Sequence, residues 1–100
     1  MSTPKIQIPG KKLAEFCQRN HIRKLAFFGS VLRDDFTPES DIDVLVEFEP
    51  GFTPGLAFFD MQDELTNMFA HKVDLNTPGF ISRYFREQVI REARVQYVQA

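Results

Sequence analysis

The sequence of 100 residues contains a single cysteine, Cys17, and no tryptophan. One cysteine cannot form a disulfide within the chain, and it cannot build a metal site made of cysteines alone. Nothing in the cysteine content requires an oxidising compartment, so a cytoplasmic location is expected. Because it stands in a helical pattern, Cys17 is expected to be a small buried hydrophobic residue.

Long hydrophobic runs are also missing. No apolar stretch approaches the roughly 20 residues that a membrane-spanning helix needs, and the N-terminal segment MSTPKIQIPGKK lacks the apolar core of a signal peptide. No membrane association is therefore expected. The apolar fraction of 43%, with 11 phenylalanines, is typical of a globular protein, and the length predicts one domain over residues 1–100.

Positive charge is absent from the middle of the chain. Between Asp34 and His71 there are ten acidic residues and no lysine or arginine, although the net charge of the whole sequence is only −2. Such a segment repels the phosphates of nucleic acids, so no direct nucleic-acid binding is expected. It can attract divalent cations or a basic partner, and an acidic surface in contact with solvent is the simpler alternative.

The hydrophobic pattern predicts a mixture of helices and strands. Helices are expected where apolar residues recur every three or four positions, over residues 10–19, 56–70 and 80–94. Strands are expected over residues 23–29, 40–49 and 72–76, one or two helical turns over 30–36, and an additional edge strand can form over 95–99. This order predicts an α/β (α+β) domain with a small mixed β-sheet and helices packed on one face of it.

Two aspartates stand one residue apart in the strand pattern SDIDVLVEFE, although aspartate is depleted in strands. Alternation puts Asp41, Asp43 and Leu45 on the face opposite the apolar side chains that begin with Ile42. The two aspartate Cα atoms should lie roughly 6–7 Å apart. Carboxylates at this spacing can converge on Mg²⁺, which prefers hard oxygen ligands. Two exposed aspartates on a polar strand face are the alternative.

A Gly-Ser pair precedes these aspartates, and a third aspartate follows on a later strand. Gly29 can let a phosphate approach the backbone, and Ser30 is a favoured cap for the helical turn that follows. An ordinary strand-to-helix turn is the alternative. Asp74 lies on the polar side of the strand 72–76. It reaches the same cation if this strand pairs beside 40–49, and it is otherwise a surface aspartate.

The segment GSVLRDDFTPESDIDVLVEF resembles the signature of the nucleotidyltransferase superfamily related to DNA polymerase β, in which an Asp-x-Asp motif follows a Gly-Ser pair. The chain is most similar to the minimal nucleotidyltransferase (MNT) members, which are single domains of this size. The resemblance spans residues 27–49 and continues weakly through KVDLNT. It implies a polymerase β-like nucleotidyltransferase fold.

The resemblance also implies roles for individual residues. In such proteins the Gly-Ser pair contacts the triphosphate of ATP, and the acids hold two Mg²⁺ ions. The implied catalytic and metal-binding residues are Asp41, Asp43 and Asp74, and the implied nucleotide-binding residues are Gly29, Ser30, Arg33 and Ser40. A guanidinium suits phosphate geometry, but Arg33 can instead pair with Asp34 or Asp35. Many members have glycine where this chain has Asp34, so the shape of that turn is not carried over.

A partner and a reaction are implied as well. MNT proteins commonly stand beside a small helical HEPN protein, and the pair resembles a toxin–antitoxin system in which HEPN is the toxin. The expected function is Mg²⁺-dependent transfer of AMP from ATP to a hydroxyl, that of a tyrosine, on the HEPN partner, as the antitoxin of a type VII-like system. A non-catalytic antitoxin that neutralises its partner by occlusion is the alternative, and the sequence does not separate the two.

Overall fold

The computed structural model describes residues 9–33 and 36–99, with the side chain of residue 80 left aside. Along the chain the elements are α1 (Gly10–Arg19), β1 (Ile22–Phe28), η1 (Gly29–Leu32), β2 (Ile42–Phe48), α2 (Ala57–Phe69), β3 (Val73–Asn76), η2 (Pro78–Phe80), α3 (Arg83–Glu92) and β4 (Arg94–Val98). Each expected helix and strand is present, and the bounds shift most at the start of α3. There residues 78–80 form the short turn η2 instead, and Ser82 caps α3 by accepting from the amide of Tyr84.

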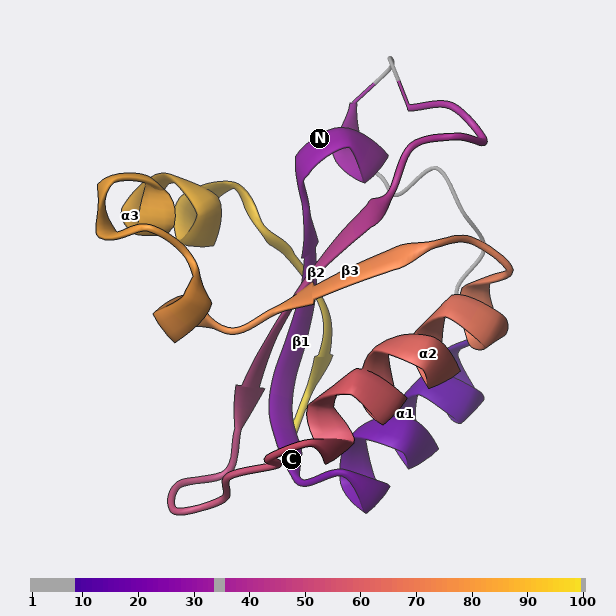
Figure 1. The fold of residues 1–100 in the computed structure, drawn as a ribbon, viewed down its shortest axis with the longest axis vertical. Helices are drawn as coiled ribbons and strands as arrows, with labels where there is room; N and C mark the ends of the chain where they lie inside the picture. The colour runs from indigo at the N-terminus through magenta and orange to yellow at the C-terminus, as the bar shows by residue number, and fades with distance from the viewer. Residues whose placement is uncertain (1–8, 34–35, 100) are drawn as a thin grey trace.

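The four strands form one mixed sheet in the order β3-β2-β1-β4 (Figure 1). Strand β1 is antiparallel to both β2 and β4, whereas β2 and β3 are parallel. Helix α2 connects β2 to β3, because parallel neighbours need a long crossover. The expected edge strand at the end of the chain is β4. One domain over the whole of residues 1–100 stays a prediction.

Helices α1 and α2 cover one face of the sheet and close the core (Figure 1). The residues of α1 at helical spacing are Leu13, Phe16 and Cys17, and all three are buried as expected. Across the layer, the ring of Phe27 on β1 meets the edge of Phe69 on α2 with centroids 5.6 Å apart. Burial raises the pKa of the Cys17 thiol to about 12, so this cysteine is an inert core residue.

The second face of the sheet is less polar than expected. Ile42, Val44 and Val46 are buried as the alternation predicts, but Leu45, which was expected among the aspartates on a polar face, is only 4% exposed. The middle of β2 is therefore covered on both faces. Asp43 stays on this second face, beside the half-buried Phe28 of β1.

Helix α3 is the element that differs most from expectation. Its pattern of Ile81, Phe85 and Val89 predicts packing against the sheet together with the other helices, yet Phe85 is 61% exposed and no residue of α3 is buried. The helix lies on the opposite side of the sheet from α1 and α2 (Figure 1). An amphipathic pattern indicates that a helix has an apolar side, but it does not say which face of the sheet remains to be covered.

None of the helices in the described part of the chain has the length and apolar character that crossing a bilayer requires.

Candidate active site

The strand register brings two of the predicted acids side by side. Asp43 stands directly opposite Asp74 in the parallel β2–β3 ladder, and opposite Phe28 in the antiparallel β1–β2 ladder. The condition set by the sequence, that the strand of Asp74 pairs beside the strand of Asp43, is therefore met. Asp43 occupies the point where the end of β1, the start of β2 and the start of β3 meet.

Gly29 lies in van der Waals contact with the carboxylate of Asp43. The backbone of Gly29 has φ +75°, and a Cβ atom added there would lie 2.2 Å from Asp43 Oδ2. Any side chain at this position would suffer both a strained φ and a collision. The turn after β1 therefore needs glycine, and that need joins the Gly-Ser pair physically to the Asp-x-Asp motif.

The surroundings of Asp43 disfavour its charged form. Burial is the largest cause, followed by the negative charges of Asp74 and Asp41, and together they raise the pKa of Asp43 from 3.8 to about 6. The charge of Arg33 acts in the opposite direction and lowers this pKa. Three acids and one guanidinium thus interact electrostatically at one position.

Asp41 precedes β2 and is the more accessible member of the Asp-x-Asp motif. Its side chain is 44% exposed, and its Oδ2 lies 3.9 Å from Nζ of Lys72. The hydroxyl of Ser30 donates to the carbonyl oxygen of Asp41 over 3.4 Å. The expectation that Ser30 caps a helical turn is wrong, because η1 begins one residue earlier and Phe28 is in the cap position without a side-chain bond.

Ser40 belongs to a tight turn before β2. Its hydroxyl oxygen accepts from the backbone amide of Thr37 at 3.1 Å, and its carbonyl accepts from the ring of His71. These bonds give Ser40 a local structural role. Asp34 and Asp35 lie outside the described residues, so the alternative of their pairing with Arg33 and the shape of the turn at Asp34 stay open.

The carboxylates are suited to Mg²⁺ but do not converge around a common point. Among the residues that the structure describes, no three His, Cys, Asp or Glu side chains are grouped closely enough to hold a metal ion. The donor chemistry of Asp41, Asp43 and Asp74 nevertheless fits a hard divalent cation, which would relieve the repulsion felt at Asp43. Asp74 is exposed and Asp41 nearly half so, which leaves both side chains room to rotate toward Asp43.

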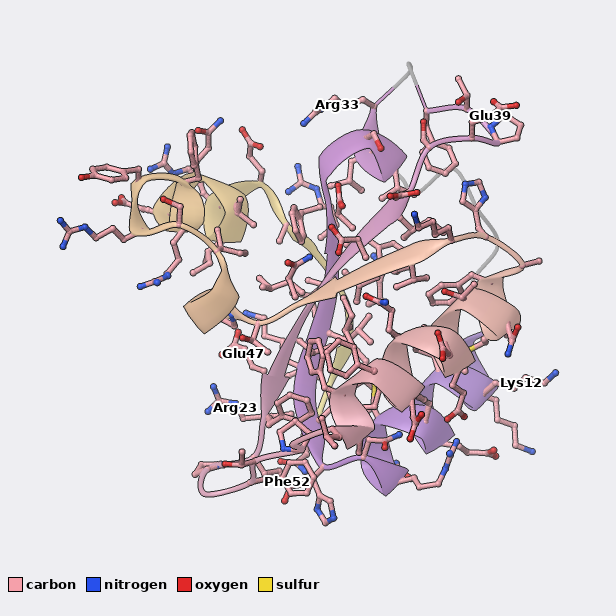
Figure 2. All side chains as sticks on the ribbon, viewed as in Figure 1. Lys12, Arg23, Arg33, Glu39, Glu47 and Phe52 are labelled. Atoms are coloured by element: carbon pink, nitrogen blue, oxygen red, sulfur yellow. The ribbon has the colours of Figure 1, made fainter. Side chains whose placement is uncertain are left out.

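Two cavities adjoin at Gly29. The first, of about 270 Å³, is lined by Phe28, Gly29, Arg33 and Asp43 and by the α3 side chains Phe85, Gln88, Val89 and Glu92. The second, of about 290 Å³, is lined by Gly29, Leu32, Arg33, Arg91, Glu92 and Arg94. Figure 2 shows Arg33 at the η1 end of the sheet, far from Glu47 and Phe52 at the other end.

An apolar cavity of about 300 Å³ occupies that other end, where Phe48, Phe52 and Phe58 contribute to its lining. It shares no lining residue with the two cavities at Gly29. The acids of the candidate site therefore do not face it.

Several residues near the site were not foreseen from the sequence. Lys72 is two positions before Asp74, so strand alternation alone would have placed it on the same side. Arg91 and Arg94 carry no such signal, because their approach to Gly29 depends on where α3 and β4 are located relative to η1. Of the predicted nucleotide-binding residues, Gly29 and Arg33 line the two cavities, whereas Ser30 and Ser40 line neither and form hydrogen bonds with backbone groups.

Comparison with known proteins connects this geometry to a family. Residues 11–97 match the family described as "Nucleotidyltransferase domain". MJ0128 of Methanocaldococcus jannaschii is 38% identical over 76 residues, which cover 75% of this chain and 76% of that protein. The "Protein adenylyltransferase MntA" of Thermococcus cleftensis is 30% identical over 78 residues, covering 78% of each.

A solved structure shares the fold. It is described as a tri-AMPylated Shewanella oneidensis HEPN toxin in complex with MNT antitoxin, and the similarity has a TM-score of 0.63 at 20% identity, covering 90% of this chain and 70% of that one. The family match spans nearly every described element, from α1 to β4, and includes the turn at Gly29 and all three acids. The resemblance inferred from the Gly-Ser and Asp-x-Asp motifs is therefore confirmed, and the chain belongs to the nucleotidyltransferase domain family.

Proposed function

We propose that this protein is a Mg²⁺-dependent adenylyltransferase that moves AMP from ATP to a hydroxyl of a HEPN-type partner, and that it acts in this way as an antitoxin. The observation that carries the proposal is the contact between Gly29 and Asp43, with Asp74 directly opposite Asp43. A backbone turn that a phosphate can approach and an acidic cluster that a cation can bridge thus meet at one point.

The comparisons support the proposal at the level of the reaction and the partner. A relative of 30% identity is named a protein adenylyltransferase, and a protein of similar fold is described in complex with an AMPylated HEPN toxin. Neither identifies the acceptor for this chain. A tyrosine hydroxyl is the proposed acceptor.

Asp41, Asp43 and Asp74 would hold two Mg²⁺ ions, which when bound would neutralise phosphate charge and lower the pKa of the acceptor hydroxyl. The side chains themselves position these charges: Asp43 is fixed against Gly29, while Asp41 and Asp74 flank it. In the transfer, the acceptor oxygen bonds to the α-phosphorus as the bond from that phosphorus to the β-bridging oxygen breaks. Diphosphate leaves with the electron pair, and the hydroxyl proton passes to solvent.

The remaining residues of the proposed site orient the nucleotide. Gly29 and Arg33 line both adjoining cavities, so a phosphate in either cavity lies beside them. The hydrogen bond from the Ser30 hydroxyl to the Asp41 carbonyl is long at 3.4 Å. The hydroxyl can therefore donate to a phosphate oxygen instead at little cost. Positioning and charge stabilisation of this kind account for most of the catalysis in phosphoryl transfer.

A non-catalytic antitoxin is the second candidate function. It is favoured by the exposed aromatic side chains of α3, where Tyr84 is 81% and Phe85 61% exposed, because a partner surface can cover them. It is also favoured by the separation of the three carboxylates, which are not grouped around one point. The experiment below distinguishes the two functions.

The test mixes this protein with a HEPN-type protein from the same genome, Mg²⁺ and ATP labelled at the α-phosphate. We expect covalent label on the partner, an added mass of one or more AMP groups and release of diphosphate. Label at the γ-phosphate should not transfer. The variant carrying Asp41→Asn and Asp43→Asn should leave the partner unlabelled and active, because the cation ligands are lost.

A matched control carries Asp60→Asn and Asp63→Asn, which remove the same charge from exposed positions of α2. This control should label the partner at the parental rate. If the Asp41 and Asp43 double variant silences the partner at the same stoichiometric ratio as the parent, and no label appears with either, the catalytic function is excluded and the occluding antitoxin remains.

A further inference from the structure

We propose that Arg91 and Arg94, together with Arg33, form the subsite for the β- and γ-phosphates of the nucleotide and for the diphosphate that leaves. The inference rests on the proposed function, because it assigns the part of the substrate that the acids do not contact. Neither arginine is near the Gly-Ser or Asp-x-Asp motif in sequence. The fold alone brings them to the turn at Gly29.

The cavity next to Gly29 is positively charged. Three arginines and one acidic residue, Glu92, line this space of about 290 Å³. The carboxylate of Glu92 accepts a hydrogen bond from Gln88 at 3.2 Å. The net charge of the lining is positive, and planar guanidinium groups bind phosphate oxygens in pairs.

Arg91 and Arg94 are available to a ligand. Within the described part of the chain, the Arg94 side chain donates to the backbone carbonyls of Glu92 at 3.1 Å and Ala93 at 3.5 Å. Arg91 contacts Glu87 at 3.2 Å, but both side chains are exposed, at 71% and 88%. An exposed ion pair of this kind contributes little to stability. A phosphate can therefore replace these contacts at little cost.

The two cavities adjoin each other. The basic cavity shares Gly29, Arg33 and Glu92 with the cavity that contains Asp43. Because the two cavities adjoin at Gly29, a nucleotide with its α-phosphate next to Asp43 has the following phosphates directed toward the arginines. Asp43 does not line the basic cavity, and Arg91 and Arg94 line only that cavity, which gives the nucleotide one orientation.

Calorimetric titration tests the proposal with three probes: ATP, AMP and inorganic diphosphate, each with Mg²⁺. The variant with Arg91→Ala and Arg94→Ala should bind ATP and diphosphate at least tenfold more weakly than the parent. Its affinity for AMP should change less than twofold, because AMP has no β- or γ-phosphate. The variant with Arg91→Lys and Arg94→Lys should recover part of the loss, since it keeps the charge without the planar fork.

The control variant carries Arg23→Ala and Arg83→Ala, which remove two positive charges from exposed positions that line neither cavity. It should bind all three probes as the parent does. Thermal melting of each variant establishes that it is folded. Equal affinity of the parent and the Arg91 and Arg94 alanine variant for ATP and diphosphate, or an equal loss in the control variant, would overturn the subsite.

The result for the phosphate subsite can be distinguished from the result for the proposed transferase function. Arginine-dependent binding of diphosphate by a protein that never labels its partner would uphold the subsite and reject the transferase. Labelling with unchanged KM for ATP in the alanine variant would uphold the transferase and reject the subsite. If both proposals hold, the variant should label the partner with a raised KM for ATP and a smaller change in kcat.

Discussion

Asp43 and Asp74 face each other across the only parallel pairing among the described strands, with no residue between them in the ladder. Like charges directly opposite in a sheet are destabilising. Burial is the largest cause of the raised pKa of Asp43, and the negative charge of Asp74 raises this pKa further. On the function proposed above, a cation at that point would offset this repulsion, and the first two predictions follow from this relationship.

The first prediction concerns ligand-induced stability. Mg·ATP should raise the melting temperature, since a ligand present at 100 times its Kd adds about 2.7 kcal/mol to the free energy of unfolding. Mg²⁺ alone should raise it much less, because the three carboxylates are not already grouped around one point. Differential scanning fluorimetry measures both shifts. No shift at millimolar Mg·ATP would count against the site as a whole.

The second prediction concerns the pH dependence of the metal-free protein. The pKa of Asp43 is raised from 3.8 to about 6 in the folded state, so the folded state binds the proton more tightly than the unfolded chain. The contribution of Asp43 to stability is therefore fully present below about pH 4 and is lost as the pH rises through 6. Asp43→Asn should remove this dependence, and at pH 7 the variant should be at least as stable as the parent.

Urea unfolding of the parent and the Asn variant between pH 4 and pH 8 gives the comparison. Asp63→Asn, on the exposed surface of α2, is the control and should keep the parental pH profile. An Asp43→Asn protein that unfolds at pH 7 would mean that the carboxylate is structural, and the assignment of Asp43 to a cation site would fail.

The third prediction concerns the glycine turn. Gly29 and Gly55 both have positive φ, +75° and +60°, but a Cβ atom would meet Asp43 Oδ2 at Gly29 and nothing within 4 Å at Gly55. Each alanine variant should lose about 1–2 kcal/mol to backbone strain. Gly29→Ala should lose more, and it alone should weaken Mg·ATP binding, because it displaces the carboxylate.

Chemical unfolding and nucleotide titration of the two alanine variants separate strain from collision. Equal stability losses and equal nucleotide affinity in Gly29→Ala and Gly55→Ala would show that the contact between Gly29 and Asp43 does not contribute to nucleotide binding.

The fourth prediction compares the two serines near Asp41. Ser30→Ala removes a long hydrogen bond of 3.4 Å to the Asp41 carbonyl, so the stability loss should be below about 1 kcal/mol. The affinity for Mg·ATP should fall by more than that loss explains. Ser40→Ala should instead affect mainly the turn with Thr37. A larger loss of ATP affinity in Ser40→Ala than in Ser30→Ala would reverse these roles.

Much of the site could be predicted because its parts are local in sequence. The alternation of residues 40–49 places Asp41 and Asp43 on one side of a strand. The Gly-Ser pair follows the preceding apolar run and therefore marks the end of the preceding strand. The pairing of Asp43 with Asp74 could only be stated as a condition, since no local pattern specifies which strands become neighbours. The structure supplies that register.

The parts that could not be predicted depend on three-dimensional placement. The burial of Leu45 requires cover on the second face of the sheet, and the period of a strand does not reveal such cover. Likewise, Arg91 and Arg94 reach the turn at Gly29 only because α3 ends and β4 begins beside it. Ser30 does not cap the helical turn as expected, because η1 starts at Gly29 and its cap position is occupied by Phe28.

The lack of buried side chains in α3 has a consequence for how this region exchanges its amide hydrogens. A helix of ten residues is marginal in water when tertiary packing contributes little, so α3 should open locally far more often than β1 or β2. Its amides should therefore exchange with deuterium much faster than those of the central strands. A ligand held by Arg91, or a partner seated on Tyr84 and Phe85, would slow that exchange, which makes α3 the part of the chain where occupancy is most easily detected.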